Sequence, residues 1–89
     1  MADVFVKDPD ETLDYVRDWS AVLGDDTISD STWTADTGIT VDSDSHTDTA
    51  ATVWVSGGTA PDRYGITNRI TTTGGRTLDH TLYFLIRSK

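Results

Sequence analysis

The feature that most constrains this chain is the alternation of apolar and polar residues on both sides of Gly74-Gly75. In residues 63–73, and again in residues 76–87, the apolar side chains fall on even positions. They are Tyr64, Ile66 and Ile70 in the first run and Leu78, Leu82, Phe84 and Ile86 in the second. This period of two predicts two strands that each bury one face, and the glycine pair between them predicts a β-hairpin.

The same pattern predicts the pairing register of the hairpin. A two-residue Gly-Gly loop would place each apolar even residue opposite a polar odd one, so the two faces would disagree. A three-residue loop over residues 73–75 pairs positions that add to 148, which sets apolar against apolar. Tyr64 then lies opposite Phe84, and Arg69 lies opposite Asp79 on the other face. We therefore predict the three-residue loop, a common hairpin connection when glycine takes the left-handed position.

The rest of the chain shows weaker signs of the same architecture. Threonine occurs sixteen times, and turn residues recur at short spacing, as in many all-β domains. Further strands are predicted over residues 13–23, 27–35, 38–41 and 49–56. For residues 8–23 a helix is the alternative, because Asp8 could cap it and Pro9 suits the first helical position.

These signs together predict an all-β protein: a small immunoglobulin-like β-sandwich of six or seven short antiparallel strands. A chain of 89 residues has room for one modest core, so we expect a single domain over residues 1–89. Residues 1–11 are predicted to be an extended or one-turn N-terminal arm. A domain this small is marginal alone, and a partner subunit is a common way to stabilise it.

Composition excludes several kinds of chemistry. The chain has no cysteine, so disulfides, thiolate catalysis and thiolate zinc sites are excluded. No apolar run approaches the ~20 residues that span a bilayer, and we expect no membrane contact. Residues 1–5 lack the basic start and apolar stretch of a secretory signal.

Charge is uneven along the chain. Residues 1–62 carry fourteen acidic and two basic side chains, whereas residues 63–89 carry one acidic and five basic ones, for a net charge of −8. The acidic excess argues against nucleic-acid binding, which needs lysine and arginine to replace phosphate counterions. The asymmetry suggests attraction between copies or docking on a partner, unless the fold interleaves the two segments.

Residues 42–48 contain the strongest candidates for a metal site. Asp42, Asp44 and Asp48 resemble part of a calcium loop, but the central glycine and the distal glutamate of an EF-hand are missing. We interpret the segment as a solvated loop, and we expect no resident metal and no cofactor. Asn68 and His80, which face each other in the predicted register, are interpreted as a satisfied polar pair.

A series of short motifs in a fixed order resembles small structural proteins of tailed bacteriophages, described as fiber-tail adaptors or related virion components. The motifs are Lys7-Asp8-Pro9-Asp10, Leu13-Asp14-Tyr15, Asp18-Trp19-Ser20, Asp26-Thr27-Ile28, Ser31-Thr32-Trp33, Val53-Trp54-Val55-Ser56-Gly57-Gly58-Thr59 and the run from Tyr64 to Arg76. The resemblance covers nearly the whole chain. It implies a virion building block without catalysis, made in the host cytoplasm.

On this basis we expect an adaptor that links tail or head–tail components to fibers through protein–protein contacts. The partners would be tail, fiber or portal-region proteins, and the chain would be present in several copies. The expected interface residues are Trp54, Arg76, Arg87 and Lys89, because Trp54 points away from Val53 and Val55 and the others form a basic C-terminal segment. The alternatives are a head decoration or cement domain, and a carbohydrate- or calcium-binding module.

Overall fold

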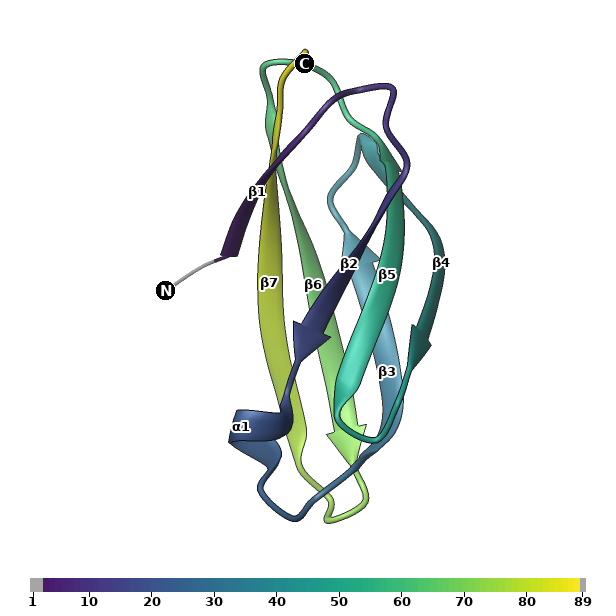
Figure 1. Cartoon of the computed structure of the whole chain (residues 1–89), viewed down its shortest axis with the longest axis vertical. Helices are drawn as coiled ribbons and strands as arrows, with labels where there is room; N and C mark the ends of the chain where they lie inside the picture. The colour runs from purple at the N-terminus through teal and green to yellow at the C-terminus, as the bar shows by residue number, and fades with distance from the viewer. Residues whose placement is uncertain (1–2, 89) are drawn as a thin grey trace.

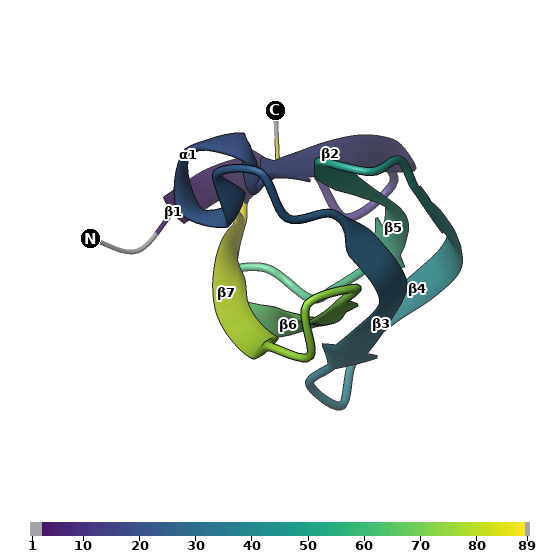
Figure 2. The same cartoon turned by 90° about the horizontal axis from the view of Figure 1, so that it is seen from below.

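The computed structural model describes residues 3–88, which fold into two β-sheets packed face to face. The elements in chain order are β1 (Asp3–Lys7), β2 (Leu13–Asp18), α1 (Ser20–Leu23), β3 (Ile28–Ala35), β4 (Ile39–His46), β5 (Ala50–Gly57), β6 (Arg63–Thr72) and β7 (Thr77–Ile86). One sheet has the strand order β1-β7-β6-β3 and the other β2-β5-β4, as Figure 1 and the end-on view of Figure 2 show. The prediction of an all-β sandwich is confirmed.

The topology is that of an immunoglobulin-like sandwich in which the first strand has joined the sheet of the last strand. β1 runs parallel to β7, with Phe5 opposite Phe84, whereas the other paired strands are antiparallel. The expectation of antiparallel strands throughout is therefore wrong for this pair. The side-chain alternation along residues 3–7 does not indicate whether this strand runs parallel or antiparallel to its neighbour, because the period of two is the same in both kinds of strand.

The β6–β7 hairpin has the predicted register. Tyr64 lies opposite Phe84 and Ile66 opposite Leu82, so all the pairs add to 148. At the turn, the Thr72 N–H donates to the carbonyl oxygen of Arg76 over 2.8 Å. The register matches the predicted three-residue turn, and a shift of one residue would turn every buried side chain of one strand outward.

The main core lies between the two sheets. It contains the fully buried side chains of β5, β6 and β7 together with Ile39 and Tyr64; these are Val53, Val55, Ile66, Leu82, Phe84 and Ile86. The Tyr64 hydroxyl accepts a hydrogen bond from the Thr59 N–H over 3.1 Å, five residues upstream. A tyrosine near the start of this strand that bonds back to the preceding corner is a hallmark of immunoglobulin-like sandwiches.

Asn68 links three segments of the chain in the second, smaller core. Its Oδ1 accepts from the Trp19 Nε1–H over 2.9 Å, and its Nδ2 donates to the Ser31 hydroxyl and to the Thr32 carbonyl oxygen over 2.9 and 3.0 Å. The side chain is fully buried. The interpretation of Asn68 as a satisfied polar residue is correct, but these partners come from β3 and from the end of β2. His80, opposite Asn68, instead lies edge-on to the Trp19 ring.

Lys7 is a buried cation that connects the two sheets. Its side chain is fully buried at the end of β1, and its Nζ donates to the carbonyl oxygens of Gly57 and Asp8 over 2.7 and 2.9 Å. Burial lowers the pKa of Lys7 from its usual value, while the nearby carboxylates of Glu11 and Asp8 act in the opposite direction. The ammonium group thus ties β1 to the end of β5 in the opposite sheet.

Two local predictions differ from the structure. Residues 13–23 are neither one strand nor one helix, because β2 ends at Asp18 and a four-residue helix follows. Residues 42–46 belong to β4 rather than to a loop. A register shift between Val41 and Ser43 lets the polar half of β4 continue along β5. An edge strand can be this polar because backbone hydrogen bonds to β5, rather than side-chain burial, hold it in the sheet.

The described residues include no helix long and apolar enough to cross a membrane.

Replacing Asn68 with alanine should lower the free energy of unfolding by roughly 2–4 kcal/mol, because the variant leaves buried polar partners unsatisfied and opens a cavity. Thr67→Ala at the neighbouring position is the control. It removes one hydrogen bond to the Thr81 hydroxyl at a half-buried site and should cost less than about 1 kcal/mol. Urea unfolding of both variants measures the difference, and equal losses would contradict the role given to Asn68.

Candidate interaction surface

The described residues enclose no pocket, and they contain no group of three or more histidine or acidic side chains placed to hold a metal ion. Asp42 and Asp44 lie along β4, whereas Asp48 lies in the turn before β5, where its carbonyl oxygen accepts from the Ile28 N–H over 2.8 Å. The expected interface residues are considered next, together with the outer faces and edges of the sandwich.

The outer face of the β2-β5-β4 sheet has an apolar centre, which we call the Trp54 face. Trp54 in the central strand β5 is 43% exposed, and Val16 in β2 is 54% exposed. Asp14 lies directly opposite Trp54 on β2, and Ser43 lies opposite it on β4. The alternation that buries Val53 and Val55 turns the indole outward, as the sequence pattern predicted.

Charge separates between the two sheets. The strands β2, β4 and β5 carry four aspartates and one arginine; the acids are Asp14, Asp18, Asp42 and Asp44. The strands of the other sheet carry three acidic and three basic residues. The fold interleaves β1 and β3 with the basic C-terminal strands, so the asymmetry along the sequence becomes an asymmetry between sheets.

The arginine of the acidic sheet does not reach the Trp54 face. Arg17 is half-buried, pairs with the buried Ala51 on the inward side, and places its guanidinium 4.6 Å from the centre of the Trp19 ring. An arginine over an indole face gains a cation–π attraction. The outward side of these strands is left with aspartates and small polar residues around the tryptophan.

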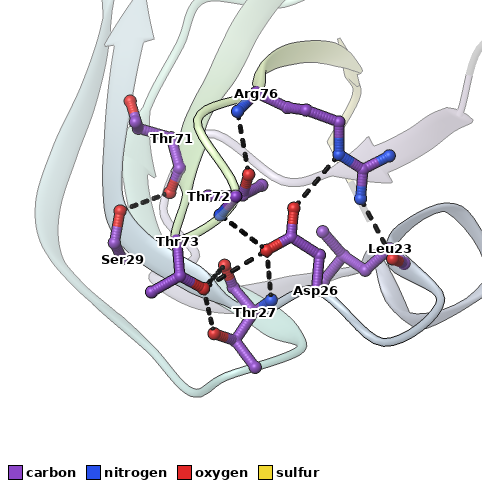
Figure 3. Close-up of polar contacts among 9 residues, drawn as sticks. Leu23, Asp26, Thr27, Ser29, Thr71, Thr72, Thr73 and Arg76 are labelled. Carbon is purple, nitrogen blue, oxygen red and sulfur yellow. Dashed lines mark hydrogen bonds and ion pairs between the residues drawn. The ribbon is translucent and has the colours of Figure 1, made fainter.

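Arg76, one of the expected interface residues, is part of a polar cluster at the hairpin end of the molecule (Figure 3). Its Nε lies 3.1 Å from Asp26 Oδ2, and its guanidinium also donates to the Leu23 carbonyl oxygen over 3.0 Å. The Asp26 carboxylate accepts in addition from the N–H groups of Thr27 and Gly74, both over 2.9 Å. The cluster fastens the β6–β7 turn to the segment between α1 and β3.

Gly74 is required at this turn for reasons of space. A Cβ on Gly74 would lie 2.8 Å from Asp26 Oδ2, closer than non-bonded atoms approach. The sequence marked Gly74-Gly75 as a turn, but it did not reveal the carboxylate that packs against it. Asp26 and Gly74 are 48 residues apart, and no local pattern connects them.

Several donors hold the pKa of Asp26 far below its usual value. The largest contribution is a hydrogen bond from the Thr72 side chain, followed by those from the Gly74 and Thr27 backbone N–H groups and from Arg76. Hydrogen bonds to a carboxylate favour its ionised form. Arg69 lowers the pKa of Asp79 in the same way on the outer face of β6 and β7, where the Arg69 Nε and Asp79 Oδ1 are 2.8 Å apart.

The other expected interface residues lie at the C-terminal end. Arg87 is exposed, and its N–H donates to the Lys7 carbonyl oxygen over 2.9 Å, which continues the β1–β7 ladder. Lys89 lies outside the described residues. The structure thus places Trp54, Arg76 and Arg87 on different parts of the molecule rather than on one surface.

Sequence reasoning missed a second apolar area, on the outer face of β1 and β7. Val4 and Val6 are about half exposed and lie opposite Tyr83 and Leu85. The Arg63 guanidinium stacks 4.6 Å from the centre of the Tyr83 ring at its border. The sequence signal for β1 is the alternation of Val4 and Val6 with Phe5 and Lys7. This signal was missed because Lys7, although buried, is a polar residue and interrupts the apolar pattern.

An immunoglobulin-like sandwich with exposed aromatic and aliphatic side chains, and no enclosed cavity in its described part, is typical of proteins that work through surface contacts. A family model described as podophage GP4 fiber-tail adaptor protein gp77 matches residues 7–85. The chain belongs to this family and is thus a phage structural adaptor protein. A comparison with curated proteins found no significant match.

Acid should weaken the fold through Asp26. Its pKa is depressed in the folded state, so the stabilisation it provides is present above the unfolded pKa of 3.8 and is lost as pH falls through and below that value. Asp26→Asn should lower stability at pH 7 and should make the free energy of unfolding depend less on pH between about 4 and 2.

Urea unfolding of the two proteins at several pH values measures this dependence. Asp25→Asn, which removes the same charge from the adjacent position, is the control for the loss of one negative charge. If Asp26→Asn and the unmodified protein lose stability in parallel as pH falls, the Asp26 cluster does not carry the effect.

Proposed function

We propose that the chain is a non-enzymatic adaptor in the virion, and that the Trp54 face binds a tail or fiber protein. The observation that carries the proposal is the exposed Trp54 in the central strand of an acidic sheet, within a chain of the fiber-tail adaptor family. Tryptophan is enriched among the residues that dominate binding energies, especially near the centre of an interface. Synthesis in the host cytoplasm and several copies in each particle belong to the same proposal.

The acidic and aromatic side chains of the Trp54 face favour a cationic partner. Asp14 lies beside Trp54 and Asp18 follows on the same side of β2, so a partner arginine can stack on the indole while it pairs with a carboxylate. Acidic residues around an apolar centre also steer a basic partner during encounter and fix its orientation. The partner surface should therefore carry arginine or lysine around a shallow apolar patch.

In a second copy of this chain three of the arginines are already engaged within the molecule, although Arg87 is exposed. Arg63 stacks on Tyr83, Arg69 pairs with Asp79, and Arg76 pairs with Asp26 within the same molecule. Freeing any of these arginines would break an existing contact. The charges favour a different virion protein as the partner, and they disfavour the head-to-tail attraction between copies that the sequence suggested.

The test uses the purified chain and the tail and fiber proteins of the phage that encodes it. Trp54→Ala should weaken binding to one of these proteins by about 30-fold or more, as expected for a hot-spot tryptophan worth about 2 kcal/mol. Binding of the unmodified chain should weaken as salt rises, because the acidic rim is screened. Isothermal calorimetry at low and high salt measures both effects.

Val22→Ala is the matched control for Trp54→Ala. Val22 is also an exposed apolar residue, but it lies on α1 rather than on the Trp54 face, so its loss should leave affinity unchanged. If Trp54→Ala binds as tightly as the control, the Trp54 face is not the interface. If none of the tail and fiber proteins binds the unmodified chain, the adaptor role itself fails.

A further inference from the structure

The four edge strands of the sandwich differ in how they are protected against pairing with another chain. An edge strand exposes unpaired N–H and C=O groups, and inward-pointing charges or bulges are common devices that prevent a new strand from joining. The edges in the described part of the chain are β1 and β3 in one sheet and β2 and β4 in the other.

Three of the edges carry an inward charge. Lys7 on β1 pairs with Ile86, Arg17 on β2 pairs with Ala51, and Asp44 on β4 pairs with Val53. The three partners are fully buried, which places each charge on the inward side of its strand. β4 has in addition the register shift between Val41 and Ser43.

The edge of β3 lacks such a charge along most of its length. Its inward residues from position 31 onward are Ser31, Trp33 and Ala35, which pair with Ile70, Asn68 and Ile66. The register shift in β3 falls at the start of the strand, between Ile28 and Asp30. Residues 31–35 therefore form a regular edge without an inward charge.

The backbone groups on this edge can be assigned. The Asp36 N–H donates to the Gly65 carbonyl oxygen over 3.0 Å. Because bonded and non-bonded positions alternate along an antiparallel pair, Thr34 and Thr32 point their backbone groups toward β6. The N–H and C=O groups of Ser31, Trp33 and Ala35 then point away from the sheet. Buried beside them, the Trp33 Nε1 has no hydrogen-bond partner among the described residues.

Immunoglobulin-like folds offer a precedent for an added strand at this position. β3, β6 and β7 correspond to the sheet of an immunoglobulin-like sandwich to which variable-type domains add their extra strands. In this chain a short turn leads from β3 directly to β4 in the other sheet, as Figures 1 and 2 show. Among the described residues no strand is hydrogen-bonded to residues 31–35 on this side. β4 contacts β3 from the other sheet, and at the start of β3 the Ile28 N–H donates to the Asp48 carbonyl oxygen in the turn after β4.

We propose that the free edge of β3, residues 31–35, accepts an extended segment of another virion protein by strand addition. Strand addition draws affinity from main-chain hydrogen bonds and specificity from alternate side chains. The segment should carry lysine or arginine, because β3 and β4 contribute Asp30, Asp42 and Asp44 and no lysine or arginine. For the same reason a second copy, whose β3 and β4 carry only these acids, is a poor occupant.

The site is separate from the Trp54 face and would give the adaptor a second contact. The inference rests on the proposed role in the virion, but not on Trp54. Loss of binding in Trp54→Ala and loss of binding through β3 are therefore independent results.

Hydrogen–deuterium exchange tests the proposal by comparing the free chain with the chain in the tail-and-fiber fraction purified from phage particles. The amides of Ser31, Trp33 and Ala35 should exchange at least about tenfold more slowly in the particle, because they gain hydrogen bonds. The corresponding free-edge amides of Asp44 and His46 on β4 should not change. Equal exchange of the β3 amides in the two samples would overturn the proposal.

Two proline variants, one on β3 and one on β4, form a matched pair that tests the β3 edge. Ala35→Pro removes a free-edge N–H from β3, and His46→Pro does the same on β4, where Thr47 and Ala50 form the neighbouring bonded pair. Proline is tolerated on an edge strand when its nitrogen faces solvent. Ala35→Pro should not be incorporated into particles, whereas His46→Pro should be. If Ala35→Pro does not fold by circular dichroism, Ala35→Lys replaces it, since an inward lysine protects the edge of β1.

The remaining outcomes are also decisive. Normal incorporation of a folded Ala35 variant would overturn the proposal while leaving the adaptor role intact. Protection of the β3 amides in the free chain as its concentration rises would identify a second copy as the occupant and would overturn the choice of a basic partner. Absence of the chain from the particles would overturn the adaptor role itself.

Discussion

The register of the β6–β7 hairpin is the constraint on which the rest of the molecule depends. It places the apolar residues of two ten-residue strands on one face, and that face forms most of the main core. β1 then adds to β7, β3 adds to β6, and the β2-β5-β4 sheet closes over the apolar face. A shift of one residue would separate Arg69 from Asp79 and would turn the apolar side chains of one of the two strands outward.

Buried and half-buried polar groups hold the remaining segments on this framework. Asn68 joins β6 to Trp19 and to β3, Lys7 joins β1 to the end of β5, and Asp26 joins the hairpin turn to the segment after α1. Each has at least one partner distant in the sequence, and such long-range contacts help to stabilise a small core without disulfides. The same contacts engage these side chains within the molecule.

The candidate surfaces could be predicted only in part. Alternation along β5 predicts that Trp54 points outward, since its neighbours Val53 and Val55 are apolar. Nothing local to Arg76 indicates that its guanidinium contacts Asp26, because that contact depends on how the hairpin turn meets the α1–β3 segment. The β3 edge was equally hidden, since whether a strand lies at the edge of a sheet is a property of the topology.

By itself, the sequence determined that the chain is all β, which hairpin it contains, and in which register the two strands pair. These are local properties, and each follows from a side-chain period of two and from a turn that needs glycine. Only the tertiary structure decided that the first strand runs parallel to the last, that a lysine is buried, and that three edges carry an inward charge while the fourth lacks one from residue 31 onward. Those features depend on residues that meet across the sandwich, and the distance along the chain between them leaves no local pattern.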